Sequence, residues 1–339
     1  MRNVLIASWL EQEHVDAIAR VPDVRLLHEQ DLLPRPRYTA DHSGPAPDLS
    51  AADLARWRDL VARAEVSFDV DWDRPAELAS TAPSLRWVQM TSAGIGGFLG
   101  RTGLDASGIV FTTAAGTHAV PLAEFALAGI LHLVKGVPDL MSWQRAHHWA
   151  RYTTGELRGR RALVVGLGSI GRETARLLDA FGVRVTGLGR TAGAAGTPGV
   201  TTLVGPADID GAMSAADLVV LACPLTDATR GLLSAERIGA LPPGAIVVNL
   251  ARGPVLDETA LAAAVRGGHL GGAVLDVFDT EPLPADSPLW DLATVLVSPH
   301  SASTVRGENA RLTELFCDNL SRDAHGRPLR NVYDAARGY

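Results

Sequence analysis

The sequence predicts an α/β protein of two domains, each a mostly parallel sheet covered by helices. Three observations support this prediction. The chain has 339 residues, which suits two domains better than one. Short apolar runs rich in Val, Ile and Leu alternate with helical patterns along most of its length. A glycine-rich turn, Gly166–Gly171, follows one such run and opens a helical pattern.

The first hundred residues contain three apolar runs typical of buried strands and two amphipathic patterns typical of helices. The expected strands are Asn3–Ala7, Val24–Leu27 and Leu85–Gln89, and the expected helices are Glu11–Arg20 and Ala51–Ala64. The segment Pro34–Pro47 is rich in proline and polar residues, which predicts a surface loop.

A long apolar helix pattern at Ala119–Val134 begins a second α/β series. Its expected strands are Arg161–Val165, Val183–Leu188, Leu218–Ala222, Ala245–Asn249, Gly272–Leu275 and Val295–Val297. A final amphipathic helix, roughly 303–322, is expected to fold back onto the first domain. We therefore expect residues 117–300 to form a dinucleotide-binding domain, and residues 1–116 with 301–339 to form a discontinuous substrate domain.

The composition excludes several classes of protein. With 47% apolar and 20% charged residues, the chain is too hydrophobic to be disordered. A net charge of −7 argues against nucleic acid or an anionic membrane as the main partner. The longest apolar stretch, Phe125–Val134, is shorter than a membrane span. Two cysteines form no disulfide framework and suggest no metal site. A soluble, cytoplasmic enzyme is the expectation.

The glycine-rich turn has the pattern that binds a dinucleotide. Gly166 permits a tight turn, Gly168 lets the backbone approach a pyrophosphate, and Gly171 lets the helix pack closely on the strand. Ser169 and Ile170 complete the turn, whose free N–H groups lie at the positive end of the helix. The alternative, glycines that serve only a tight turn, fits this strand–turn–helix context less well.

The end of the next strand indicates which dinucleotide binds. An acid at this position bonds the ribose 2′-hydroxyl of NAD, but here Arg190 and Thr191 follow Gly189. An arginine beside a hydroxyl suits a 2′-phosphate through charge-assisted hydrogen bonds. NADP(H) is therefore the preferred cofactor and NAD(H) remains possible. The alternative for Arg190 is a solvated surface residue.

Three further segments follow predicted strands of the same domain, at the edge where α/β sheets place their chemistry. They bring an arginine, Arg252, a carboxylate, Glu281, and a histidine, His300. Each alone has a structural interpretation: an exposed loop base, a solvated acid or a capping residue. Together they can move a proton and bind an anion, because a carboxylate-paired histidine can donate a proton and an arginine can bind a carboxylate or polarise a carbonyl.

These segments together resemble the D-isomer-specific 2-hydroxyacid dehydrogenases. The motifs occur in order over nearly the whole chain: TSAGI, AVPLAEFAL, GLGSIGRETARLLDAFG, ACPLT, NLARGPVLDETAL, LDVFDTEPLP and SPHSA. The resemblance implies two Rossmann-like or flavodoxin-like αβ domains with a cofactor cleft between them. It also implies that Arg252 binds the substrate's carboxylate and carbonyl, that His300 is the acid/base, and that Glu281 orients His300 and raises its pKa.

The resemblance assigns further binding residues. Backbone N–H groups of Ala93 and Gly94 are expected to hold the substrate carboxylate, although Gly96 stands where the family often has an aspartate. Asp276 is expected to bond the nicotinamide carboxamide, with a strand-end turn acid as the alternative. The predicted cofactor-binding residues are Gly166, Gly168, Ser169, Ile170, Gly171, Arg190, Thr191, Cys223, Pro224, Thr229, Leu250, Ala251, Asp276 and His300. We interpret Cys223 as a packing residue and not a nucleophile.

Within the family, chemistry of the glyoxylate/hydroxypyruvate reductase type fits best, with a small 2-keto acid as substrate. One alternative is a dinucleotide-sensing binding protein of the corepressor type on the same fold. Another is an NAD-dependent phosphoglycerate dehydrogenase, which often carries an extra regulatory domain. The resemblance also implies a homodimer paired through Ala119–Val134 and Trp143–Tyr152. No metal, nucleic acid or membrane is expected as a partner.

Overall fold

The computed structural model describes residues 1–189 and 196–338. The chain folds as two compact units. Unit 1 comprises Met1–His118 and Thr304–Tyr339, and unit 2 comprises Ala119–Ser303. Each unit has its own sheet and its own core.

Unit 1 is built on a five-stranded parallel sheet with the order β2-β1-β3-β4-β5. Because β1 lies between β2 and β3, the strand order reverses there, and the gap between β1 and β3 is the switch point of this sheet. The strands are β1 (Arg2–Ile6), β2 (Val24–Leu27), β3 (Val66–Phe68), β4 (Trp87–Gln89) and β5 (Val110–Thr112).

Helices cover both faces of the unit 1 sheet, because alternate strand residues point to opposite faces and both sets are apolar. One face carries Val4 and Ile6 and packs with Phe316 of α11, whose ring lies 5.3 Å from that of Trp87. The other face carries Leu5 and Val88 and packs with a second set of helices. The helices are α1 (Gln12–Ala19), α2 (Ala51–Arg63), α3 (Leu78–Thr81), α4 (Gly96–Thr102) and α11 (Glu308–Ala324).

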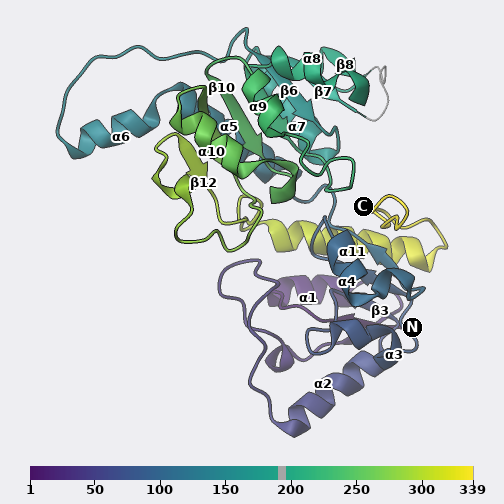
Figure 1. The fold of residues 1–339 in the computed structure, drawn as a ribbon. Helices are drawn as coiled ribbons and strands as arrows, with labels where there is room; N and C mark the ends of the chain where they lie inside the picture. The colour runs from purple at the N-terminus through teal and green to yellow at the C-terminus, as the bar shows by residue number, and fades with distance from the viewer. Residues whose placement is uncertain (190–195, 339) are drawn as a thin grey trace. The chain divides into compact units, whose positions relative to one another are not determined.

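Unit 2 is built on a seven-stranded parallel sheet with the order β12-β11-β10-β9-β6-β7-β8 (Figure 1). Its strand order reverses between β6 and β9, which places the switch point directly after the first strand of the unit. The strands are β6 (Arg161–Val165), β7 (Arg184–Leu188), β8 (Thr202–Val204), β9 (Leu218–Leu221), β10 (Ala245–Asn249), β11 (Leu270–Leu275) and β12 (Val295–Val297).

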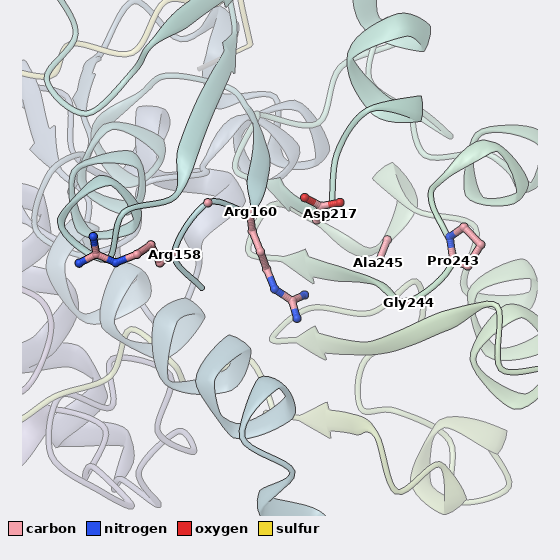
Figure 2. Close-up of a pocket in the computed structure, with 7 residues that line it drawn as sticks. Arg158, Arg160, Asp217, Pro243, Gly244 and Ala245 are labelled. Carbon is pink, nitrogen blue, oxygen red and sulfur yellow. The ribbon is translucent and has the colours of Figure 1, made fainter. Parts of the chain in front are cut away.

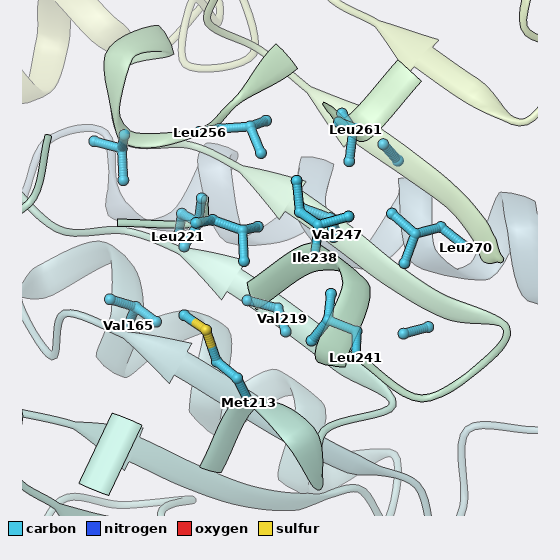
Figure 3. Close-up of a cluster of buried hydrophobic side chains, with 14 of the residues drawn as sticks. Val165, Met213, Val219, Leu221, Ile238, Leu241, Val247, Leu256, Leu261 and Leu270 are labelled. Atoms are coloured by element: carbon cyan, nitrogen blue, oxygen red, sulfur yellow. The ribbon is translucent and has the colours of Figure 1, made fainter. Parts of the chain in front are cut away.

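Two helix layers cover the unit 2 sheet as well. Leu163 and Val165 of β6 point into one core, which also contains Met213 and Leu261 (Figure 3). Their neighbours in β6 point into the opposite core, beneath α5 and α7. The helices are α5 (Ala119–Val134), α6 (Val137–Arg145), α7 (Ser169–Ala180), α8 (Ile209–Ser214), α9 (Ala235–Ala240) and α10 (Glu258–Arg266).

Most predicted elements are confirmed, several with identical bounds, such as Val24–Leu27, Ala119–Val134 and Ala245–Asn249. The predicted start of the last helix is wrong, because α11 begins at Glu308 instead of near residue 303. The three-residue strands β3, β5 and β8 were not predicted, although the equally short β12 was predicted with identical bounds.

Among the residues that the structure describes, no single helix is long and apolar enough to cross a membrane. The helices α5 and α6, which meet at an angle of 64°, reach that length and apolar composition only when taken together.

Candidate functional site

The glycine loop joins β6 to α7 at the switch point of the unit 2 sheet. Gly166 has a φ of +93°, and a Cβ there would lie 2.8 Å from the backbone of Cys223. A Cβ on Gly171 would collide with the carbonyl oxygen of Gly166, whereas a Cβ on Gly168 would meet nothing within 4 Å. Gly166 and Gly171 are therefore needed by the fold itself. Gly168 instead borders open space, which is what a bound pyrophosphate requires.

The first turn of α7 provides the anion-binding groups that a dinucleotide needs. Gly168 is its N-cap and has no side chain to cap the helix, and Ser169 is exposed. The N–H groups of this turn therefore face outward at the positive end of a 12-residue helix. These residues fit a dinucleotide phosphate. Arg190 and Thr191, predicted to contact its 2′-phosphate, lie outside the described residues.

Cys223 and Pro224 follow β9, and the backbone of Cys223 lies against the glycine loop, as the close approach of Gly166 shows. Burial raises the pKa of the Cys223 thiol to about 11, which is consistent with a packing role. Thr229 Oγ1 donates to the Pro224 carbonyl at 2.7 Å and accepts from the Thr226 N–H at 2.8 Å. These bonds fold the turn that presents Cys223 and Pro224 beside the glycine loop.

Arg252 follows β10 on a turn that the Asn249 side chain shapes. Asn249 Oδ1 accepts from the Ala251 N–H at 3.0 Å, and its Nδ2 donates to the Arg252 carbonyl at 3.2 Å. The Leu250 N–H donates to the Leu221 carbonyl at 3.0 Å and so extends the hydrogen bonds between β10 and β9 by one residue. Burial lowers the pKa of Arg252 from its ordinary value, and the charge of Glu281 opposes this shift. The Arg252 guanidinium and the Glu281 carboxylate thus belong to one electrostatic cluster.

His300 and Glu281 form a pair at the same edge of the sheet. His300 Nδ1 lies 2.8 Å from Glu281 Oε2, while Glu281 Oε1 accepts from the Phe278 N–H at 2.9 Å. The carboxylate can only accept, so Nδ1 carries the hydrogen and Nε2 is left for other chemistry. Both side chains are partly exposed, with 44% of the His300 side chain accessible. The imidazole is therefore oriented and reachable.

Asp276, which is only 2% exposed, anchors the loop that carries His300. Its Oδ1 accepts from Ser298 Oγ at 2.6 Å and from the N–H groups of Ser301 and Ala302 at 3.0 Å each. These bonds flank His300 on both sides and hold its backbone at a φ of +53°, a conformation that few L-residues adopt. Burial raises the pKa of Asp276 and the bond from Ser298 opposes this shift.

Glu258 is a residue of this cluster that the sequence analysis did not single out. It begins α10, and its Oε1 accepts from the Asp279 N–H at 2.5 Å. Burial raises the pKa of Glu258, and the charges of Asp279 and Glu281 add to the shift. Its side chain therefore holds the turn that carries Glu281. The signal in the sequence is an acid directly after the helix N-cap Asp257, facing a turn that also contains acids.

The predicted substrate loop lies in unit 1, after β4. Thr91 is buried, and its Oγ1 donates to Asp69 Oδ2 at 3.0 Å. Ala93 is half-buried and Gly94 is exposed, which suits backbone donors to a ligand. A Cβ on Gly96 would lie 2.6 Å from the Gly338 carbonyl oxygen. The C-terminal segment therefore explains why no aspartate stands at position 96.

A broad depression on unit 2 lies away from all these residues. It is lined by residues that precede β6, β9 and β10, among them Arg160, Asp217 and Pro243 (Figure 2). The glycine loop, Cys223 and Arg252 instead follow the same strands, at the opposite edge of the sheet. Because parallel α/β sheets bind ligands at the carboxyl ends of their strands, this depression is not the dinucleotide site. Within residues 1–189 and 196–338, no group of acidic, histidine or cysteine side chains could hold a metal ion.

Residues 127–302 match the family model for the NAD binding domain of D-isomer specific 2-hydroxyacid dehydrogenases. This segment contains the glycine loop, Arg252, Glu281 and His300. The chain belongs to the D-isomer specific 2-hydroxyacid dehydrogenase family.

Curated relatives with different substrates in their names support this membership. The D-3-phosphoglycerate dehydrogenase of Mycobacterium tuberculosis is 35% identical over 320 residues, which cover 92% of this chain and 55% of that protein. The (S)-sulfolactate dehydrogenase of Chromohalobacter salexigens is 34% identical over 255 residues, covering 73% and 80% of the two chains. The chain thus spans about half the length of the phosphoglycerate dehydrogenases that it matches.

Solved structures of the family agree with the whole fold. A D-isomer specific 2-hydroxyacid dehydrogenase from Xanthobacter autotrophicus, in complex with NADPH and MES, is 30% identical. It has a TM-score of 0.77 and covers 100% of this chain and 99% of its own. An NADPH-dependent glyoxylate/hydroxypyruvate reductase from Sinorhizobium meliloti, in complex with NADP and sulfate, is 25% identical with a TM-score of 0.78. It covers 100% of both chains.

In this member of the family, unit 2 brings the predicted glycine loop, Arg252, Glu281 and His300 to the carboxyl ends of one sheet. Ala93 and Gly94 lie at the corresponding edge of the unit 1 sheet. The predicted fold class, two parallel α/β domains, is confirmed. The roles assigned to individual residues remain predictions.

Proposed function

We propose that the protein is an NADP(H)-dependent reductase of small 2-keto acids, interconverting them with 2-hydroxy acids. The observation that carries this proposal is the His300–Glu281 pair, 2.8 Å between Nδ1 and Oε2, at the sheet edge that also holds the glycine loop. A dinucleotide site beside an oriented imidazole suits reduction of a carbonyl, which needs a hydride on carbon and a proton on oxygen.

The nicotinamide, when bound, supplies the hydride. His300 acts as the acid in its imidazolium form: Nδ1–H stays bonded to Glu281, and the proton on Nε2 passes to the carbonyl oxygen, which leaves a neutral imidazole with its hydrogen on Nδ1. Arg252 binds the substrate carboxylate and polarises the carbonyl, since its planar guanidinium can engage both groups. In the reverse direction His300 accepts the proton. Ala93 and Gly94 offer backbone N–H donors to the carboxylate.

The preference for NADP(H) rests on Arg190 and Thr191, which stand in the sequence where an acid would favour NAD. Relatives that have been solved with NADPH or NADP support the same preference. Asp276 is proposed to bond the carboxamide through the oxygen that does not hold the His300 loop. Leu250, Ala251, Cys223, Pro224 and Thr229 form the remaining wall of the proposed site.

Two other functions remain as alternatives. The phosphoglycerate dehydrogenases are similar over most of this chain, which favours oxidation of phosphoglycerate. A dinucleotide sensor on the same fold would bind the cofactor without turning over a keto acid. Each differs from the proposed reductase in a measurable way.

The deciding experiment follows the loss of reduced-nicotinamide absorbance with glyoxylate, hydroxypyruvate and phenylpyruvate, each with NADPH and with NADH. Turnover that is faster with NADPH is expected. The Arg190→Ala variant should lose most of that preference, and an unchanged ratio would make Arg190 a surface residue. Tight dinucleotide binding without turnover of any keto acid would instead support the sensor.

We also propose that the protein forms an isologous dimer through α5, α6 and the segment that follows them. Several large apolar side chains there are exposed, including Met141 at 44% and Trp149 at 94%. Exposed apolar side chains gathered in one region are typical of subunit interfaces. Light scattering after size exclusion should give twice the chain mass, and a monomer mass would refute the dimer.

A further inference from the structure

After α11 the chain returns to the unit 1 sheet and pairs with β5. The Thr113 N–H donates to the Asn331 carbonyl at 2.8 Å. The Tyr333 N–H donates to the Phe111 carbonyl at 2.8 Å, and the two bonds form an antiparallel bridge. We call residues 331–338 the returning segment. Because β5 ends the strand order, the start of this segment covers an outer edge of the sheet.

A buried amide fixes where the returning segment begins. Asn319 of α11 is fully buried, and its Oδ1 accepts from the Arg330 N–H at 2.8 Å. Its Nδ2 donates to the Arg330 carbonyl and to Oε1 of Gln89, at 3.2 Å each. Gln89 ends β4, the strand that leads into the proposed substrate loop. Displacing the segment would leave buried polar groups without partners, which is costly.

Asn331 connects the returning segment to the substrate loop through the turn that follows β5. Its Nδ2 donates to the Ala115 carbonyl at 2.7 Å and to the Thr113 carbonyl at 3.3 Å. In the same turn, the Ala114 N–H donates to the Ser92 carbonyl at 3.0 Å. Ser92 belongs to the substrate loop, so the turn after β5 is bonded both to the segment and to the loop.

The returning segment also contacts the other end of the substrate loop. Asp334 folds the segment into a turn, in which the Ala336 N–H donates to Asp334 Oδ1 at 3.0 Å and the Gly338 N–H donates to the Asp334 carbonyl at 2.9 Å. This turn lies against Gly96, which begins α4 at the end of the loop. A Cβ on Gly96 would be 2.6 Å from the Gly338 carbonyl oxygen and 3.0 Å from the Tyr333 hydroxyl.

We propose that the returning segment positions the substrate loop. It holds the loop at both ends and so sets the backbone geometry with which Ala93 and Gly94 bind the substrate carboxylate. Asn331 and Gly96 are the positioning residues, since Asn331 provides the hydrogen bonds and Gly96 the close contact. This inference rests on the proposed function, in which the loop binds the carboxylate, and extends it to residues far from the loop in the sequence.

The expected kinetic signature follows from what the loop binds. The carboxylate is present in the keto acid, in the transition state and in the hydroxy acid, so the loop binds all three alike. Loss of such uniform binding raises KM and leaves kcat nearly unchanged. A general loss of folded protein would instead lower kcat. A rise in KM at constant kcat therefore separates a positioning role from a merely structural one.

The first test fills the space at Gly96. Gly96→Ala places a methyl group against the Gly338 carbonyl, so the segment or the loop has to move. We expect KM for glyoxylate to rise about tenfold, as loss of one hydrogen bond to a charged group would give, with kcat and NADPH affinity within about twofold of wild type. Gly100→Ala is the matched control, because its Cβ lies on the same helix and meets nothing within 4 Å.

The second test removes the Asn331 amide without straining the backbone. Asn331 has a φ of +56°, which glycine adopts readily, so Asn331→Gly loses the two bonds to the turn after β5 and keeps the backbone conformation. We expect a rise in KM of about tenfold here as well. Asp23→Gly is the matched control, because Asp23 is an exposed residue of unit 1 with a φ of +60°.

A binding measurement examines the loop without turnover. Oxalate carries a carboxylate but has no keto group to reduce. Calorimetric titration of the NADPH-loaded protein with oxalate should give a Kd about tenfold weaker in Gly96→Ala and in Asn331→Gly than in wild type. The two control variants should bind oxalate as wild type does.

Wild-type KM and oxalate affinity in both Gly96→Ala and Asn331→Gly would refute the inference and leave the proposed function intact. A fall in kcat at unchanged KM would also refute it. If one variant does not fold, the other decides. A wild-type protein that turns over no keto acid would refute the proposed function, and its oxalate affinities would still test the segment. Absence of both turnover and oxalate binding would refute the two proposals together.

Discussion

The carboxyl edges of the two sheets use polar residues in opposite ways. At the unit 2 edge, Asp276 accepts from Ser298 on the loop that carries His300. Glu281 accepts from the Phe278 N–H and pairs with His300. At the unit 1 edge, Asp71 and His42 each keep one buried polar atom without a partner. All the described buried side-chain atoms that lack a partner lie in unit 1.

The two sheet edges therefore differ in how completely their buried polar groups are hydrogen-bonded. A hydrogen-bond network fixes side chains in one geometry. Buried polar groups without partners instead cost free energy in the folded protein. The fold therefore sets the geometry of the unit 2 groups through bonds that are largely absent around the unpartnered atoms of unit 1.

The largest expected effect tests the unit 2 edge. His300→Ala should lower kcat by about 10²–10⁴, because the proton donor is lost, and leave NADPH affinity nearly unchanged. The control is His325→Ala, since His325 is an exposed histidine at the end of α11 and belongs to neither the proposed site nor the proposed interface. Fluorescence titration measures NADPH affinity separately from kcat. Loss of NADPH binding in His300→Ala would show that His300 does not have the proposed role.

Arg252→Ala should raise the keto-acid KM and lower kcat together, with a fall in kcat of about 10²–10³, because Arg252 is proposed to bind the substrate and the developing oxyanion. Steady-state kinetics with glyoxylate measures both parameters. The exposed Arg230, changed to alanine, is the control for loss of one positive charge on unit 2. Normal kinetics in Arg252→Ala would contradict the assignment.

A smaller effect is expected at Glu258, which acts through the turn that carries Glu281. Glu258→Ala removes the acceptor for the Asp279 N–H and should lower kcat/KM about tenfold, as loss of one charge-assisted hydrogen bond would. Glu258→Gln keeps an acceptor and should restore most of the activity. Glu236→Ala, in the first turn of α9, should have no effect. Equal losses in the alanine and glutamine variants would argue against a positioning role.

The smallest effect concerns the stability of the Pro34–Pro47 loop of unit 1. The hydrogen bond from Arg37 lowers the pKa of Asp41 to about 2, although burial opposes the shift. A carboxylate with a depressed pKa stabilises the fold above its unfolded pKa of 3.8, and this contribution disappears as the pH falls through about 2.

Asp41→Asn should therefore cost about 1–2 kcal/mol of unfolding free energy at pH 6, with the exposure of Arg37 reducing the full value. The difference from wild type should shrink between pH 4 and pH 2. Urea denaturation at several pH values measures this difference. Asp48→Asn, which changes an exposed carboxylate, is the control. A difference that does not depend on pH would mean that the ion pair contributes nothing.

The sequence predicted those features that depend on local pattern. The strand–glycine–helix motif at Gly166–Gly171 needs only the neighbouring residues, and the structure shows that Gly166 and Gly171 have no room for a side chain. The order of the motifs likewise placed Arg252, Glu281 and His300 after strands. The carboxyl ends of parallel strands lie at one edge of the sheet, so the topology itself brings these three residues to the same edge.

Other features could not be predicted, because they depend on residues far apart in the chain. Glu258 and Asp279 are 21 residues apart and meet only when α10 packs beside the turn after β11. A pocket in unit 1 is lined by residues that follow β1 and β3 and by the Pro34–Pro47 loop. Position 96 has no room for a side chain because the carbonyl of Gly338, near the other end of the chain, lies against it.

By itself the sequence determined the fold class, the dinucleotide motif and the three residues of the proposed reaction, since each is written in a contiguous segment. Tertiary structure alone decided which polar atoms find partners. A hydrogen bond needs a donor and an acceptor about 3 Å apart, and only the packing of the folded chain sets that distance. Packing left Asp71 Oδ2 and Trp72 Nε1 buried without partners and gave Asp276 three donors around His300.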